Sequence, residues 1–302
     1  MSKIKKILLI FSSIAVIVIV FLIFNSKISI KNINSVSGKI KIVAAENFWG
    51  SLASQLGGNR VSVISLVTDP NANPHEYEVN SSDARAFAKA NYVIVNGAGY
   101  DSWALTMLKA NPSPSRKLLD VATLLGKKNG DNPHFWYNET YVNQVIMQMK
   151  NTFISLEPSQ KVYFNNQYQL LRNKLAVYQD RLSSIKKKFA GIKVGATENI
   201  FVYLANSTGL DLISPPAFMQ AEAEGTDPPA SSVVTFQNQI TTHQIKVLVY
   251  NTQTISPMTN NLKKLAIANH IPIVPISETI QPPNETFQNW MNNQLILLEK
   301  AL

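Results

Sequence analysis

Two Asn-Pro-His turns are the feature of this sequence best suited to chemistry. They are Asn73-Pro74-His75 and Asn132-Pro133-His134, and they hold two of the four histidines among 302 residues. Proline fixes its own φ and restricts the residue before it, so the backbone leading into each histidine is stiff. A stiff approach suits an imidazole that must hold a ring nitrogen in a set place, as a metal ligand does. We therefore expect these two distant segments to converge on one site.

Three carboxylates occupy comparable positions next to predicted strands. Glu198 follows the predicted strand 193–197, Glu278 follows the predicted strand 271–276, and Asp69 precedes the first Asn-Pro-His turn. Two imidazoles with two carboxylates suit a divalent first-row metal, because manganese prefers oxygen-rich surroundings and zinc tolerates them beside histidine. Spacing alone leaves alternatives open. A histidine in a turn is more often a surface group or a cap, and a glutamate after a strand is more often solvated or at a helix start.

The composition narrows the classes of site and partner. The chain has no cysteine, which excludes a disulfide framework, a thiolate metal site and a cysteine nucleophile. Any metal must therefore be held by imidazole and oxygen. The net charge is +9, but residues 1–38 carry five lysines and no acid, which leaves +4 for the rest. We find no arginine-rich stripe and no aromatic-basic interleaving, so we expect no nucleic-acid binding.

The N-terminus has the pattern of an export or anchoring segment. Lys3, Lys5 and Lys6 precede an uncharged run over 7–24, which as a helix spans roughly 27 Å, close to the ~30 Å hydrocarbon core. It is longer than the ~7–15 residues of a secretory apolar region. We therefore predict a signal anchor over 1–24, with a cleaved signal peptide as the alternative, and a polar tether over 25–39.

The flanking lysines predict where the rest of the chain lies. They keep the N-terminus inside and place the remainder on the extracellular face of the cytoplasmic membrane. If the segment is cleaved, the protein is secreted instead.

Alternating strands and helices predict the fold class. Residues 40–156 and 191–302 each show an α/β pattern, which argues for two doubly wound lobes with parallel sheets. Between them, 157–190 reads as one long helix, with Pro158 near its start and Gly191 after its end. Some thirty residues span ~45 Å, more than one lobe, so we interpret this helix as a bridge. Ligands of such sheets bind beyond the carboxyl ends of the strands, where His75 is expected.

Several motifs carry a resemblance to a known family. The chain resembles the zinc/manganese solute-binding proteins of bacterial ABC importers over about residues 40–302. The motifs that carry the resemblance are Val43–Phe48, Asn73–Glu78 followed by Ser82-Asp83, Val95–Tyr100, Asn132–Trp136 and Thr197–Ala205.

This resemblance implies a fold, a site and a function. It implies two lobes joined by one long helix, with a metal in the cleft between them. The family's four ligands fall on His75, His134, Glu198 and Glu278. The implied function is capture of a divalent metal, Mn²⁺ or Zn²⁺ with Fe²⁺ as a third candidate, and delivery to an ABC permease. We expect a monomer that is not an enzyme.

The chain departs from the family pattern at several points. Asn replaces the family's Asp in both Pro-His motifs, and Glu278 stands where an Asp is usual. Glu198 occupies the third ligand position without a histidine-rich loop, which resembles the manganese-type members. Many members are lipoproteins anchored through a cysteine, and this sequence has none. The apolar segment itself would then be the tether.

Two other functions were weighed. A metal-dependent hydrolase usually keeps water at an open coordination position, and four protein ligands leave little room for it. The chain also has no His-Glu-x-x-His or Gly-x-Ser-x-Gly motif. A surface adhesin that kept the fold with reduced metal binding is the second alternative, motivated by the Asn-for-Asp changes. Beside the site, Trp136 fits either a cleft wall or core packing, and 221–229 is expected to be a loop on the cleft side.

Overall fold

The computed structural model describes residues 38–70 and 72–302. The predicted anchor over 1–24 and nearly all of the predicted tether lie outside these residues. Among the helices that the structure describes, none is both long and apolar enough to cross a membrane. Residues 39–302 form one unit, and this unit carries every element and contact that follows.

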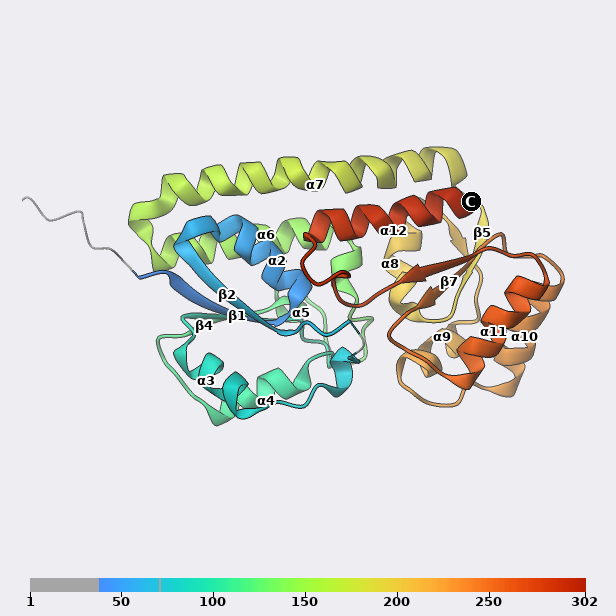
Figure 1. Cartoon of the computed structure of the whole chain (residues 1–302), viewed down its shortest axis with the longest axis horizontal. Helices are drawn as coiled ribbons and strands as arrows, with labels where there is room; N and C mark the ends of the chain where they lie inside the picture. The colour runs from blue at the N-terminus through green and yellow to red at the C-terminus, as the bar shows by residue number, and fades with distance from the viewer. Residues whose placement is uncertain (1–37, 71) are drawn as a thin grey trace, which may run out of the picture. The chain divides into compact units, whose positions relative to one another are not determined.

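The first sheet has four parallel strands in the order β2-β1-β3-β4 (Figure 1). The strands are β1 (Ile40–Glu46), β2 (Val61–Val67), β3 (Tyr92–Val95) and β4 (Lys117–Asp120). The helices that follow them are α2 (Asn47–Gly57), α3 (Ser81–Lys89), α4 (Ser102–Ala110), α5 (Val121–Leu124) and α6 (Glu139–Leu156). Both β1 and β3 are almost entirely buried, as expected for parallel strands covered on both faces.

The second sheet repeats this topology in the order β6-β5-β7-β8, again all parallel. Its strands are β5 (Lys193–Ala196), β6 (Asp211–Leu212), β7 (Leu248–Asn251) and β8 (Ile273–Ile276). The helices are α8 (Val202–Thr208), α9 (Pro216–Ala223), α10 (Ala230–Thr241), α11 (Pro257–Ala268) and α12 (Phe287–Ala301). The two doubly wound parallel sheets predicted from the sequence are confirmed.

Apolar side chains cover both faces of each sheet. A large core runs from Ile42 and Ile94 of the first sheet to Val194 and Val249 of the second. A separate cluster packs α3 and α4 on the opposite face of the first sheet, and another packs α10 and α11 on the opposite face of the second. This burial holds the strand ends, and therefore the loops that follow them, in fixed positions.

The long helix α7 (Lys161–Phe189) connects the two sheets after a short 3₁₀ turn at Pro158–Gln160. Its 29 residues span roughly 43 Å, and it packs against α2 and α6 as well as α8 and α12. Seven side chains form its buried stripe, namely Phe164, Tyr168, Leu171, Leu175, Tyr178, Leu182 and Ile185. The predicted bridging helix is confirmed, and Val162 near its start lies outside the stripe, with 73% of its surface exposed.

The strand order reverses beside β1 in the first sheet and beside β5 in the second. Such switch points open a crevice beyond the carboxyl ends of the strands, where ligands bind in open α/β sheets. The residues that follow β2, β5, β7 and β8 therefore define the place to look for a site.

Candidate metal centre

His75 is held by its own turn. Pro74 begins a 3₁₀ turn after β2, and the Oδ1 atom of Asn73 accepts a hydrogen bond from the His75 backbone N at 3.1 Å. Trp103 Nε1 donates to the Pro74 carbonyl at 3.1 Å. The His75 ring meets the ring of Tyr100 edge-on, with centroids 4.4 Å apart. The stiff turn expected from the sequence therefore aims this imidazole, which remains 30% exposed.

His134 is held in the same way but is buried. Asn132 Oδ1 accepts from the His134 backbone N at 3.1 Å and lies 2.7 Å from ring Nδ1. When Nδ1–H donates to that oxygen, the lone pair of the ring lies on Nε2, as a metal ligand requires. Nε2 is buried and has no hydrogen-bond partner among the described residues. Burial, and then the charge of His75, hold the pKa of His134 well below its usual value, so the ring is neutral.

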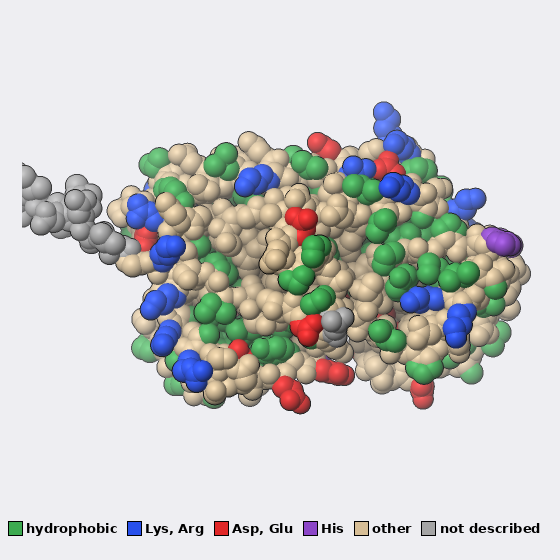
Figure 2. Space-filling model, in the orientation of Figure 1, with side chains coloured by type: hydrophobic (Ala, Val, Ile, Leu, Met, Phe, Trp, Pro, Cys, Tyr) green, Lys and Arg blue, Asp and Glu red, His purple; other side chains and the backbone are tan. Residues whose placement is uncertain are grey.

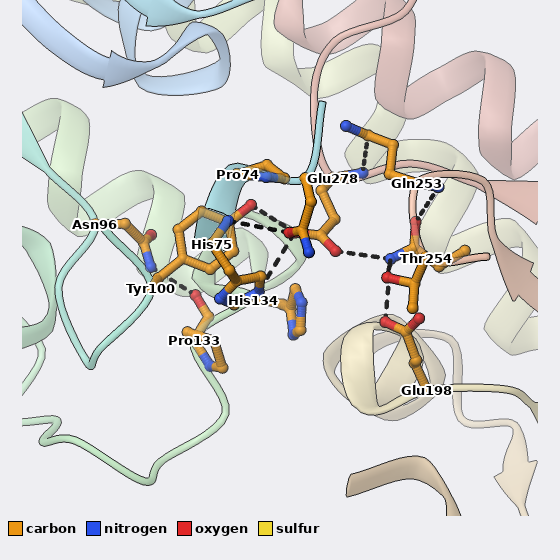
Figure 3. Close-up of polar contacts among 12 residues, drawn as sticks. Pro74, His75, Asn96, Tyr100, Pro133, His134, Glu198, Gln253, Thr254 and Glu278 are labelled. Carbon is orange, nitrogen blue, oxygen red and sulfur yellow. Dashed lines mark hydrogen bonds and ion pairs between the residues drawn. The ribbon is translucent and has the colours of Figure 1, made fainter. Parts of the chain in front are cut away.

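Glu278 brings a carboxylate to these rings. It follows β8 and is 1% exposed. Its Oε2 atom accepts from the Tyr100 hydroxyl at 2.7 Å and lies 3.6 Å from His75 Nε2. One ligand atom from each of His75, His134 and Glu278 lies within 4.8 Å of the others (Figure 3). Ligands ~2.1 Å from a tetrahedral ion are roughly 3.4 Å apart, so the spacing suits one metal ion.

Glu198 lies outside this trio. It follows β5 and is 1% exposed. Its Oε2 atom accepts from Asn251 Nδ2 at 3.0 Å, and the same nitrogen donates to Glu278 Oε1 at 2.7 Å. The Asn251 amide therefore lies between the two carboxylates, and Glu198 Oε1 is buried without a partner among the described residues. Burial, followed by the charge of Glu278, raises the pKa of Glu198 to about 8.

Asp69, the other carboxylate considered, does not join the trio either. Its carbonyl accepts from the Ala72 backbone N at 3.2 Å in the turn after β2. This residue shapes the approach to His75.

A cavity of about 330 Å³ is lined by both histidines of the trio. His75, Tyr100 and His134 line it from the first half of the chain, whereas Asn199 and Glu222 line it from the second. The site thus lies where segments from the two halves meet, and about half of the residues that line the cavity carry a side-chain oxygen.

Comparison with known proteins identifies the family. The family model described as "Zinc-uptake complex component A periplasmic" matches residues 42–301. The chain belongs to this zinc-uptake family.

Individual relatives agree with this assignment. A metal ABC transporter substrate-binding lipoprotein, SsaB of Streptococcus sanguinis, is 24% identical over 68% of this chain and 70% of its own length. The manganese-binding lipoprotein MntA of Halalkalibacterium halodurans is 26% identical over 65% of this chain and 66% of its own length. A crystal structure of ZnuA superposes with a TM-score of 0.68 at 20% identity and covers 87% of this chain and 98% of that one. The structural likeness bears on the fold alone.

In this member of the zinc-uptake family, asparagine stands where the family pattern has aspartate in both Pro-His motifs, and each asparagine holds the histidine that follows. Asn73 and Asn132 each cap the backbone of the following histidine, and Asn132 also contacts the ring. A neutral amide oxygen fixes the ring tautomer as a carboxylate would, but adds no negative charge. The departure therefore preserves the position of the histidines.

Two neighbouring expectations have mixed outcomes. Trp136 is fully buried, stacks on Phe48 with centroids 4.1 Å apart and meets the His134 ring edge-on at 5.2 Å, so it is core packing directly behind the site. Segment 221–229 reaches the cavity through Glu222 and Glu224, which confirms the expectation that it lies on the side of the site. It is not wholly a loop, because α9, with Pro216 in its first turn, extends to Ala223.

Sequence reasoning missed three residues of the site. Asn251 ends the central strand β7 at the switch point, and a polar residue in that place was the available signal. Tyr100 belongs to one of the family motifs, but the motif does not indicate that its hydroxyl donates a hydrogen bond to the Glu278 carboxylate. Gln253 had no signal, because its partners Glu278, Thr279 and Ala72 are distant in the sequence.

A second pair of acids lies near the trio. Glu46 ends β1 and is fully buried, and burial with the nearby Asp101 raises its pKa well above the usual value. Asp101 accepts from the backbone N atoms of Asn96 and Gly97 at 2.6 and 2.8 Å, and burial raises its pKa to about 6. The raised pKa values of both groups favour their neutral forms, which limits the negative charge that Glu278 faces.

Proposed function

We propose that this protein captures one divalent transition metal ion outside the cytoplasm and delivers it to an ABC permease. The observation that carries the proposal is that His75, His134 and Glu278 each bring one ligand atom within 4.8 Å of the others, beside a cavity that both histidines line. The His134 nitrogen is buried and neutral, with its lone pair uncommitted. A divalent cation satisfies that lone pair and offsets the crowded carboxylates in one step.

Glu198 supplies the fourth ligand in this proposal. Its Oε1 atom is buried and uncommitted, and its other oxygen is held by the Asn251 amide. Coordination requires this carboxyl to lose its proton and turn toward the trio. The halves of the chain then act as an N-terminal lobe (40–156) and a C-terminal lobe (191–302), joined by the linking helix (157–190).

The donor set allows manganese or zinc, with iron as a third candidate. Two carboxylates suit Mn²⁺, whereas affinity order favours Zn²⁺ at a nitrogen–oxygen site. The family is named for zinc and the MntA relative for manganese. On the face drawn in Figure 2, acidic side chains lie mainly toward the middle of the molecule and lysines and arginines toward the ends. Acidic groups near the middle favour the approach of a cation.

We propose a route to the membrane that differs from the one in the names of the relatives. SsaB and MntA are described as lipoproteins, whereas these 302 residues include no cysteine. We propose that the apolar run over 7–24 tethers a monomer to the extracellular face of the membrane, beside its permease. The family is one of transport proteins, and we propose no enzymatic activity.

The test is titration of metal-free protein with Mn²⁺ and Zn²⁺ by calorimetry. We expect one site per chain in the wild type and no stoichiometric binding after His75→Ala with His134→Ala. The control replaces the other two histidines, His243→Asn with His270→Asn. Both are exposed at helix ends with φ of 53° and 58°, a conformation that Asn tolerates. Unchanged binding in the first double variant would refute the site.

A further inference from the structure

Two glutamine side chains hold the chain segment that leads into His75. Gln253, just after β7, donates through Nε2 to the Ala72 carbonyl at 2.8 Å. Gln281 donates through Nε2 to the Pro70 carbonyl at 3.0 Å. Both carbonyls lie between β2 and the His75 turn. The second half of the chain therefore holds the backbone approach to a ligand supplied by the first half.

The other end of the Gln253 amide holds a second ligand. Its Oε1 atom accepts from the backbone N of Glu278 at 2.8 Å and from that of Thr279 at 3.0 Å. Gln253 is 8% exposed, and its own backbone N donates to Asn251 Oδ1 at 3.0 Å. One buried amide thus connects the approach to His75 with the backbone of Glu278, as the contacts drawn for Gln253 in Figure 3 illustrate in part.

We propose that Gln253, assisted by Gln281, is a positioning residue that sets the separation of His75 from Glu278 and so controls how fast metal leaves. The proposal rests on the metal-capture function above. The two ligand atoms are 3.6 Å apart, and ligand–metal bonds tolerate deviations of only ~0.2 Å. Movement of the His75 approach leaves the buried Nε2 donor of Gln253 without its acceptor, which is costly, unless the glutamine side chain moves with it and so releases the Glu278 backbone. Movement of the His75 approach and release of the Glu278 backbone are thereby coupled.

The chain contains a matched control for this connection. Gln55 of α2 and Gln288 of α12 exchange amide hydrogen bonds of 3.0 and 2.9 Å. This pair also joins the first half of the chain to the second, and it has the same chemistry. Among the described residues, the side-chain hydrogen bonds of Gln55 and Gln288 join them to each other and to Ser51, and none joins either of them to a residue of the trio. Cutting it removes a connection between the halves without touching the approach to His75 or Glu278.

The experiment compares Gln253→Met, Gln281→Met and Gln288→Met in the full chain. Methionine keeps an unbranched side chain of similar length and removes the amide donor and acceptor. The first measurement is the rate of Mn²⁺ release on mixing with excess chelator. We expect Gln253→Met to speed release ~10–100-fold, the range for loss of a partner that orients a ligand. Gln281→Met should speed it several-fold, and Gln288→Met should leave it within about twofold.

The second measurement is backbone amide hydrogen exchange in the metal-free protein. We expect faster exchange at Ala72, Asn73 and His75 in the Gln253 and Gln281 variants, and wild-type exchange there in the Gln288 variant. If Gln253→Met loses its cooperative thermal transition, Gln281→Met carries the test, because it removes the contacts of Gln281 to the Pro70 carbonyl and to Gln253 Oε1 but leaves the Gln253 bonds to Ala72 and Glu278 in place.

Two results would overturn the positioning role. One is an unchanged release rate with unchanged exchange in both Gln253→Met and Gln281→Met. The other is equal acceleration by Gln288→Met, which would show that any connection between the halves has the same effect. Wild-type protein that binds neither Mn²⁺ nor Zn²⁺ would instead refute metal capture, and the exchange measurement would still decide whether the glutamines hold the His75 approach.

Discussion

The histidine side and the carboxylate side of the site are built in different ways. His75 and His134 are each placed by local chain: a proline before the ring and an asparagine two residues earlier that caps the backbone. Glu278 and Glu198 are instead held by a side-chain amide from another strand end, Asn251. Imidazoles set by their own turns are ready to bind, whereas the carboxylates depend on distant partners for their position.

The two sides also differ in charge. His134 is neutral, because burial lowers its pKa. The carboxylates crowd one another, and burial with the charge of Glu278 raises the pKa of Glu198 to about 8. A divalent cation relieves this crowding, whereas it gains from the imidazoles only two coordinate bonds. The carboxylate side therefore controls the dependence of capture on pH, and the histidine side provides a fixed frame.

The largest expected effect comes from removing the carboxylate that contacts both sides. Glu278→Ala deletes a proposed ligand, leaves the Tyr100 hydroxyl without its acceptor and leaves Glu198 as the one carboxylate that accepts from the Asn251 amide. We expect Mn²⁺ and Zn²⁺ affinity to fall by more than ~100-fold, the upper range for loss of an orienting partner alone. Calorimetric titration measures it. The control is Glu224→Ala, an exposed glutamate on the cavity rim. Equal weakening by both would mean that general negative charge, not ligation, binds the cation.

Glu198→Gln tests whether the Glu198 carboxyl loses a proton when the metal binds. A pKa near 8 means that the wild-type carboxyl is protonated at pH 7 and must release close to one proton when it coordinates. The glutamine variant should bind Mn²⁺ and Zn²⁺ more weakly and release fewer protons on binding. Titration in buffers of different ionisation enthalpy counts these protons. Identical proton release in both proteins would place the titrating group elsewhere.

The same substitution should change how stability depends on pH in the metal-free protein. Because the folded pKa of Glu198 lies above its unfolded value, its stabilisation is complete below the unfolded pKa and is lost as pH rises toward about 8. Between pH 5 and 8 the wild type should lose on the order of 3 kcal/mol more than Glu198→Gln, since each pKa unit is worth ~1.4 kcal/mol. Urea unfolding at several pH values measures the difference. Parallel curves would contradict the raised pKa.

Sequence reasoning reached the histidine side more fully than the carboxylate side for a physical reason. The Asn-Pro-His turns are local, so their geometry can be inferred from three consecutive residues. Glu278 was also inferred, because it follows a predicted strand. A polar residue at the end of β7 was visible in the sequence, but the place of the Asn251 amide between the two carboxylates depends on which strands are neighbours in the sheet.

The same limit applies to the fold. The long helix and the main strands were recognised from periodicity, whereas β6 has two residues and β4 exposes two of its four, too little pattern to detect. The start of helix α3 depends on a pair of residues, because Asn80 is the cap and Asp83 completes the capping box.

The smallest expected change in metal affinity comes from substitutions of the two asparagines that hold the histidines. Asn132→Leu removes the acceptor 2.7 Å from His134 Nδ1, whereas Asn73→Leu removes only a backbone cap. We expect about tenfold weaker Zn²⁺ binding in the first and a change of no more than a few-fold in the second, since ring partners fix the tautomer of a ligand. Asn132 also donates to the Asn199 carbonyl at 2.7 Å. Asn132→Asp removes that donor but keeps the acceptor, so near wild-type affinity there would assign the loss to the ring contact. Weak binding in both Asn132 variants would assign it to Asn199, and the histidine frame would then depend on the other half of the chain as the carboxylates do.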